Sequence, residues 1–258
     1  MNIYNQLQLR ELFHIEFLRW MSRKIKADNY VLKGGTNLRF FFNSIRYSED
    51  MDLDIKGTKV DNLKDLVMTI LQAPSFNDNL NPFGIERIIP PDISKAKQTE
   101  TTQRFKIHLI TSSGEDLFTK VEFSRRGFNG LTAVEPVSDN ILRAYKMSPL
   151  LVSHYDIQSA IAQKIGALAS RSVIQARDIF DLYILSSQHK PQKNIMLDKN
   201  KLTKAHENTF EIGFEQFRDS VLAYLNPEDQ ASYVTADSWD EIKLKTANFI
   251  AELRGNHG

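Results

Sequence analysis

The order of hydrophobic and polar residues predicts β-strands mainly in the first half of the chain. Short apolar or alternating runs, which suit a pleated strand, are bounded there by glycine, proline and serine. A Ser-Ser-Gly turn at residues 112–114 separates the last two runs and predicts a hairpin. The expected strands cover residues 30–33, 48–55, 105–110 and 118–124.

Apolar residues at helical spacing open the chain and dominate it after Pro149. Residues 74–91 contain four prolines and are expected to be rich in loops. Strands early and helices late predict an α+β fold, with a core domain over 1–148 and an α-helical domain over 149–258. Helices are expected over 5–27, 36–43 with Thr36 as N-cap, 62–72, 156–186 with a break near 170–172, 200–225 and 238–253.

Acidic side chains gather on one face of the strand expected at 48–55. Because successive side chains of a strand point to opposite faces, Ser48, Asp50, Asp52 and Asp54 share a face. Carboxylates this close raise each other's pKa unless a cation lies between them. A hard divalent cation, Mg²⁺ or Mn²⁺, satisfies such oxygen ligands best, and this points to phosphoryl chemistry.

A glycine turn precedes the acidic strand and leads into a short helix. Gly34, Gly35 and Thr36 form this turn. Glycine lets backbone N–H groups approach a ligand closely, and a helix N-terminus favours phosphate. Phosphate at the turn would lie beside metal at the acidic strand, which is the arrangement that a nucleoside triphosphate (NTP) requires.

Composition narrows the class of protein. The chain has 258 residues, with 41% hydrophobic and 25% charged content, as in a soluble globular protein with a full core. It contains no cysteine, which excludes disulfides and thiolate zinc sites. No membrane-spanning run or signal pattern is visible, so a cytoplasmic location without a membrane partner is expected.

The net charge of +1 does not by itself indicate nucleic-acid binding. The distribution of charge is more informative, because five lysines between residues 190 and 204 face a single acid, Asp198. Solvated surface is the simpler interpretation of this cluster, and an RNA-contacting surface is the functional one. Its lysines are Lys190, Lys193, Lys199, Lys201 and Lys204.

Two blocks of residues together resemble the AbiEii/MenT-type nucleotidyltransferase toxins, within the DNA polymerase β-like superfamily. The blocks lie more than a hundred residues apart and occur in the order of the family, which argues against chance. The first block contains Leu32, Lys33, Gly34, Gly35, Thr36, Arg46, Ser48, Asp50, Asp52 and Leu53. The second contains Ala162, Lys164, Arg171, Arg177, Asp178, Asp181, Leu182 and Tyr183.

The resemblance implies a metal-dependent enzyme with a mixed-sheet nucleotidyltransferase core. It would transfer NMP from an NTP to an acceptor, the 3′ end of a tRNA, as the toxin of a toxin–antitoxin or phage-defence system with a cognate antitoxin. The implied residues are Asp50, Asp52, Lys164 and Asp178 for catalysis, Asp50, Asp52 and Glu122 for metal, and Lys33, Gly34, Gly35, Thr36, Arg46, Ser48 and Asp181 for the nucleotide.

The choice of acids stays open at two points. Asp52-Leu53-Asp54 repeats the same Asp-apolar-Asp form, so Asp54 could replace Asp50, although the family's serine two residues before its first acid selects Asp50. Glu122 is the candidate third carboxylate, with Asp116 in reserve. An exposed strand glutamate paired with a lysine explains Glu122 nearly as well.

The second block also has two interpretations. An unpaired ammonium on Lys164 would be costly in its apolar neighbourhood, so a triphosphate or a carboxylate is expected to satisfy it. Arg177, Asp178 and Asp181 lie within helical reach of one another. They fit either a functional site or a structural salt-bridge network that clamps the helical half to the core.

Two other functions remain possible at the level of sequence. The same site could nucleotidylate a protein hydroxyl or phosphorylate a small molecule. A non-catalytic nucleotide- or RNA-binding module could also retain the fold, but the presence of Asp50, Asp52 and Lys164 favours an enzyme.

Overall fold

The computed structural model describes residues 4–189 and 197–255. The chain forms two compact units, the first made of Met1–Phe40 and Tyr47–His154, the second of Phe41–Arg46 and Tyr155–Gly258. In this division the helical unit begins at Tyr155 and also includes the short segment Phe41–Arg46 from the first half of the chain.

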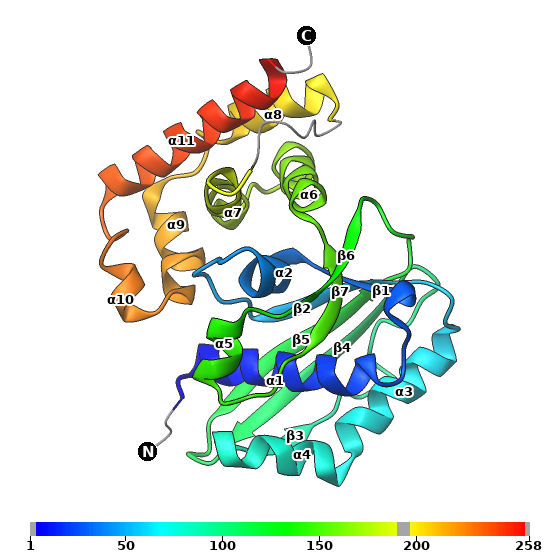
Figure 1. Ribbon diagram of the computed structural model, residues 1–258. Coiled ribbons are helices and arrows are strands. Elements are labelled where there is room, and N and C mark those ends of the chain that lie inside the picture. Colours follow the sequence, from blue (N-terminus) through cyan, green and yellow to red (C-terminus); the bar gives the residue numbers. More distant parts are fainter. Residues whose placement is uncertain (1–3, 190–196, 256–258) are drawn as a thin grey trace. The chain divides into compact units, whose positions relative to one another are not determined.

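A mixed seven-stranded sheet forms the centre of the first unit (Figure 1). Its strands are β1 (Tyr30–Lys33), β2 (Asp50–Ile55), β3 (Ile85–Ile89), β4 (Thr102–Thr111), β5 (Asp116–Ser124), β6 (Thr132–Pro136) and β7 (Leu151–Tyr155). They follow the order β3-β4-β5-β2-β1-β7-β6. β1 pairs antiparallel with β2 and parallel with β7, β2 pairs parallel with β5, and β3, β4 and β5 are antiparallel neighbours. The predicted α+β class is confirmed.

Helices of the first unit pack on one face of this sheet. The helices of the first unit are α1 (Gln6–Ser22), α2 (Gly34–Phe41), α3 (Val60–Gln72), α4 (Pro74–Leu80) and α5 (Asp139–Ala144), with 3₁₀ turns at Ala27–Asn29 and Asn81–Phe83. α1 packs on β5, and α3 and α4 pack on β3. Phe105, Ile107, Val121 and Phe123 are fully buried on this apolar side of β4 and β5. The alternate positions of both strands are more exposed and polar.

Helix α1 is tied to the strand that carries the acids. It begins with a capping box between Asn5 and Gln8. Inside the helix, His14 Nε2 lies 2.9 Å from Thr119 Oγ1, and that hydroxyl donates to the carbonyl of Glu49 at 2.7 Å. Burial, and the charge of Arg10, lower the pKa of His14 to about 3, so the ring is neutral. His14 is therefore a packed residue, as the sequence indicates.

Three expectations about the first unit are wrong. Helix α2 begins at Gly34, so Thr36 lies inside the helix and does not cap it. The segment expected to be loop-rich contains α4 and β3. Pro74 stands at the start of α4, where proline is tolerated, and Phe76 and Leu80 are buried. The strands β6 and β7 were not predicted.

The second unit consists of helices, as predicted, including the break after Ser170. Its core contains Phe217 and Trp239, whose rings stack with centroids 4.3 Å apart. Among the described residues, no helix has both the length and the apolar content needed to cross a bilayer. The helices are α6 (Ile157–Ser170), α7 (Ala176–Ser186), α8 (Lys199–Asn208), α9 (Phe214–Ser220), α10 (Pro227–Gln230) and α11 (Ala236–Gly255), with a 3₁₀ turn at Leu222–Tyr224.

Candidate active site

The three aspartates of β2 differ in what surrounds them. Asp50 Oδ2 lies 2.9 Å from Lys120 Nζ, while Asp50 Oδ1 is buried and has no hydrogen-bond partner among the described residues. Asp54 is buried and forms an ion pair with Lys33. Asp50 and Asp52 are only partly covered. Asp50 therefore offers a carboxylate oxygen that a ligand could satisfy, whereas Asp54 is already paired.

Asp52 lies directly against the glycine bend. Gly34 has a φ of +71°, a conformation that side chains disfavour. A Cβ atom at Gly34 would stand 3.1 Å from Asp52 Oδ2. Glycine at this position thus permits both the turn and the close approach of the carboxylate, and the bend and the acid lie side by side as expected.

Burial raises the pKa of Asp52 above its usual value. The charge of Lys120 opposes this shift, and the nearby Glu122 carboxylate adds to it. The ionised form of Asp52 is therefore less stable in the fold than in water. A cation bound here would lower the free energy of the ionised form.

Cross-strand pairing extends the polar face from β2 to β5 and β4. Asp52 lies opposite Glu122, which lies opposite Arg104. Arg104 Nε is 2.7 Å from Glu122 Oε2, so the ion-pair partner of Glu122 is this arginine, whereas the structural alternative named a lysine. Asp116, the reserve candidate, is bound to His108 at 2.9 Å.

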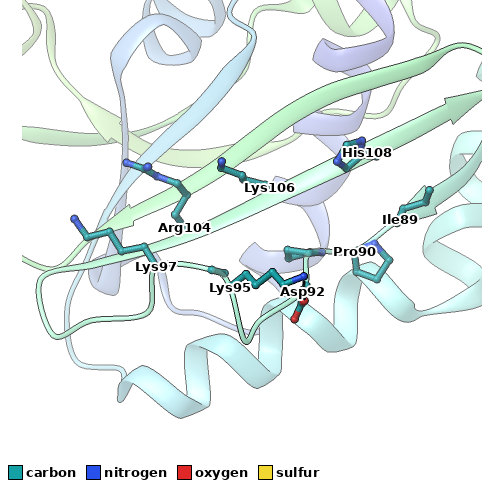
Figure 2. Close-up of a pocket in the computed structure, with 10 residues that line it drawn as sticks. Ile89, Pro90, Asp92, Lys95, Lys97, Arg104, Lys106 and His108 are labelled. Atoms are coloured by element: carbon teal, nitrogen blue, oxygen red, sulfur yellow. Dashed lines mark ion pairs between the residues drawn. The ribbon is translucent and has the colours of Figure 1, made fainter.

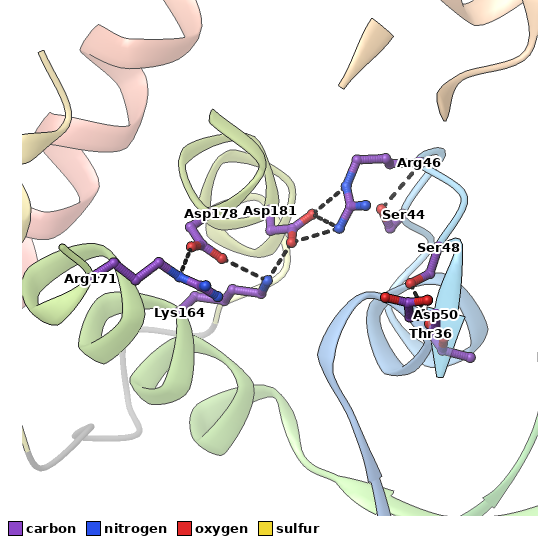
Figure 3. A network of polar contacts seen from close by, with 9 residues as sticks. All are labelled: Thr36, Ser44, Arg46, Ser48, Asp50, Lys164, Arg171, Asp178 and Asp181. Carbon is purple, nitrogen blue, oxygen red and sulfur yellow. Dashed lines mark hydrogen bonds and ion pairs between the residues drawn. The ribbon is translucent and has the colours of Figure 1, made fainter. Parts of the chain in front are cut away.

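The hydroxyls of Thr36 and Ser48 fix the start of β2 (Figure 3). Both lie within hydrogen-bond distance of the Asp50 carbonyl, Thr36 Oγ1 at 3.0 Å and Ser48 Oγ at 2.7 Å. A carbonyl oxygen only accepts, so both hydroxyls donate to it. In this conformation the two hydroxyls position the backbone of Asp50. Because their protons are already donated, they could only accept a hydrogen bond from a ligand or bind a cation through oxygen.

The donor set around Asp50 and Asp52 fits Mg²⁺ or Mn²⁺ that also binds substrate. Within the described parts of the chain, no three His, Asp or Glu side chains form a metal cluster of their own. Mg²⁺ commonly takes only one or two carboxylates and completes its shell with phosphate oxygens and water. The unpartnered Asp50 oxygen and the destabilised Asp52 carboxylate suit this role.

The second block of sequence residues forms a buried ion-pair network in the helical unit (Figure 3). Lys164 Nζ lies 3.0 Å from Asp178 Oδ1 and 2.6 Å from Asp181 Oδ2. Arg46 holds Asp181 through both carboxylate oxygens, and Arg171 Nε lies 2.8 Å from Asp178 Oδ2. Both aspartate side chains are fully buried. Carboxylates thus satisfy Lys164, one of the two outcomes expected.

Burial by itself would raise the pKa of Asp181, but the charges of Arg46 and Lys164 outweigh it, and the pKa is lowered. The carboxylate is therefore ionised at neutral pH. Arg177 is exposed, and no ion pair found among residues 4–189 and 197–255 includes it.

The structure thus collects the sequence-predicted residues in two groups. The first unit brings together Gly34, Thr36, Ser48, Asp50, Asp52 and Glu122, and the second unit Arg46, Lys164, Asp178 and Asp181. Lys120 and Arg104 were missed as partners of the acids. The alternation of Lys120 and Glu122 was visible in the sequence, but the parallel pairing of β2 with β5 was not.

The lysine cluster at 190–204 is only partly covered by the structure. Lys190 and Lys193 lie outside the described residues. Lys199, Lys201 and Lys204 belong to α8, where Lys204 forms an exposed ion pair with Glu207.

A comparison with protein families identifies the chain. The profile of the family described as nucleotidyl transferase AbiEii toxin, type IV toxin–antitoxin system, matches residues 16–249. The chain belongs to the AbiEii family. It is a nucleotidyltransferase toxin by this membership, and an NTP is the substrate that the family implies.

Solved structures share the fold of this AbiEii chain. A Helicobacter pylori protein described as a candidate nucleotidyltransferase is 19% identical, with a TM-score of 0.61 over 98% of this chain and 97% of that one. JHP933 from Helicobacter pylori is 20% identical, with a TM-score of 0.56 over 98% and 94%. The nucleotidyltransferase toxin MenT4 from Mycobacterium tuberculosis H37Rv is 16% identical, with a TM-score of 0.59 over 95% and 84%. No curated protein matches at the level of sequence.

The raised pKa of Asp52 predicts that its neutral amide variant is more stable at neutral pH. Without divalent metal, Asp52→Asn should raise the unfolding temperature at pH 7 by about 2–4 °C. This difference in unfolding temperature should shrink as the pH falls toward 4. Asp52 of the folded wild type is then protonated, and the cost of burying its ionised carboxylate disappears. Differential scanning fluorimetry in EDTA measures this, with the exposed Asp65→Asn as control. A lower unfolding temperature for Asp52→Asn would contradict the assignment.

The buried network predicts a large loss of stability when one acid is removed. Asp181→Asn leaves Arg46 and Lys164 short of a charged partner in a buried place and should cost about 3–5 kcal/mol. Asp240→Asn, whose aspartate is 69% exposed, should cost less than about 1 kcal/mol. Urea denaturation compares the two. The loss of stability should persist down to about pH 5, because the pKa of Asp181 lies below the ordinary value of 3.8 and its carboxylate stays ionised at that pH.

Proposed function

We propose that the protein transfers a nucleoside monophosphate from an NTP to the 3′-terminal hydroxyl of a tRNA, and that the reaction takes place on the polar face of β2 and β5. The single observation that carries this proposal is the pair Asp50 and Asp52 beside the Gly34 bend, with one buried carboxylate oxygen unpartnered. A strand with a purely structural role gives no reason to bury an unsatisfied carboxylate oxygen. A cation-binding site explains it, because the bound cation would satisfy this oxygen.

Asp50 and Asp52 would hold the divalent metal, and the pairing of Asp54 with Lys33 supports this choice over Asp52 and Asp54. Bound Mg²⁺ would supply charge neutralisation for the triphosphate and make the acceptor hydroxyl more acidic. Glu122, opposite Asp52, is the third acid. It could accept the proton of the acceptor hydroxyl once its ion pair with Arg104 opens.

The phosphates would be bound where α2 begins. The first N–H groups of a helix have no partner within the helix, and the glycines at 34 and 35 let phosphate oxygens reach them. Lys120 and Lys33 already lie within ion-pair distance of the β2 aspartates. Both can exchange these carboxylates for phosphate oxygens when the substrate binds.

The family resemblance assigns Lys164 to catalysis, with Asp178 and Asp181 to hold it. An ammonium group has three donors, and these aspartates account for two of them. The remaining donor would be free for a phosphate oxygen. Arg46 then acts indirectly, because its two bonds to Asp181 fix the carboxylate that holds Lys164.

A tRNA acceptor would explain growth arrest, and a cognate antitoxin would neutralise the enzyme in the cytoplasm. The main alternative is nucleotidylation of a protein hydroxyl. Incubation with total RNA, total protein and each α-³²P-labelled NTP separates the two by the fraction that takes up label.

The proposal predicts that label transfer depends on the acids of β2. Asp50→Asn and Asp52→Asn should each lower the rate by more than about a hundredfold, because each removes a charged metal ligand without changing the shape of the side chain. Lys164→Ala should have a similar effect. Circular dichroism checks that each variant is folded, and Asp65→Asn is the matched control. Wild-type rates in either β2 variant would refute this site.

A further inference from the structure

A basic pocket lies on the same sheet as the acids, in the first unit. Its volume is about 520 Å³. Figure 2 shows Arg104, Lys106 and His108 along β4, and Lys95 and Lys97 on the loop that precedes this strand. Ile89 and two prolines, Pro90 and Pro91, give it an apolar wall. Of the residues that line it, the nucleotidyl transfer described above involves only Arg104, the ion-pair partner of Glu122.

The pocket has an excess of positive charge. Four basic side chains line it, against one acid, Asp92. Asp92 forms an exposed ion pair with Lys95 at 3.4 Å, a contact of little energetic value. Lys97 and Lys106 form no ion pair in the part of the chain that the structure describes. An anion is the natural ligand of such a pocket.

The strand register connects this pocket with the acids. Lys106 lies opposite Lys120, and Lys120 lies opposite Asp50. Residues directly opposite in a sheet share a face, so Lys106 is on the acidic face, two strand spacings or about 10 Å from Asp50. A fully stacked strand advances by about 3.4 Å per nucleotide, so this distance corresponds to at most about three nucleotides.

We propose that this pocket binds backbone phosphates of the acceptor RNA, a few nucleotides before the 3′ end that receives the nucleotide. The inference rests on the proposed RNA acceptor. A chain of phosphates is attracted by several positive charges close together, and Lys95, Lys97 and Lys106 supply them around the pocket. The apolar wall of Ile89 and Pro90 suits a ribose or base beside the phosphates. Binding through backbone phosphates does not depend on the nucleotide sequence of the RNA.

The test removes the charge and keeps the length of the side chains. The triple variant Lys95→Gln/Lys97→Gln/Lys106→Gln is compared with Lys24→Gln/Lys26→Gln/Lys59→Gln, which removes three exposed lysines of the same unit outside the pocket. Binding of the full chain to fluorescein-labelled unstructured RNA is measured by anisotropy between about 50 and 200 mM salt. Binding of a fluorescent NTP is measured in parallel.

The pocket variant should bind RNA about a hundredfold more weakly at about 0.1 M salt. Its plot of log K against log salt should be shallower by about 2, because three phosphate contacts at about 0.7 each are lost. The control variant should match the wild type, and NTP binding should be the same in all three proteins.

Other results would overturn the inference in distinguishable ways. If wild type labels RNA and both variants bind it equally well, the pocket assignment alone fails. If wild type neither binds nor labels RNA, the proposed acceptor is wrong and the pocket assignment fails with it. If only NTP binding is weakened, the pocket serves the triphosphate.

Discussion

The repulsion between carboxylates on one face of β2 is the constraint on which the first unit depends. A strand that places aspartates at alternate positions must supply positive charge nearby, and here Lys120 and Lys33 do so for Asp50 and Asp54. No ion pair among the described residues includes Asp52, and burial raises its pKa. The surrounding structure keeps this unfavourable charge in place, because Thr36 and Ser48 fix the Asp50 carbonyl and Gly34 leaves room for Asp52. The fold thus holds Asp52 where its ionised form is destabilised, and a bound cation would stabilise that form.

In the helical unit, by contrast, the buried aspartates are paired with basic side chains. Its two buried aspartates lie within ion-pair distance of three basic side chains, and the charges of two of these, Arg46 and Lys164, lower the pKa of Asp181. Such a network is a poor site for a metal but a good means of holding Lys164 in one orientation. The structural and catalytic interpretations of this block are therefore compatible, since a positioning network must itself be rigid.

Local sequence patterns predicted the parts of the structure that depend on near neighbours. The acidic strand, the β4–β5 hairpin and the break after Ser170 follow from alternation, turn residues and helical spacing. The pairing of β2 with β5 could not be predicted, because a parallel register depends on contacts far apart in the chain. For the same reason Lys120 and Arg104 were missed as partners of the acids. The prolines at the start of α4 and after β3 predict loops, but they stand at the ends of these elements and leave their interiors regular.

Anomalous diffraction from crystals soaked with Mn²⁺ and a non-hydrolysable NTP tests the central claim most directly. The account predicts manganese peaks bound to the carboxylates of Asp50 and Asp52, with the triphosphate against the first turn of α2. Manganese bound elsewhere, with the ion pair between Asp50 and Lys120 intact and the Gly34 bend empty of phosphate, would contradict it.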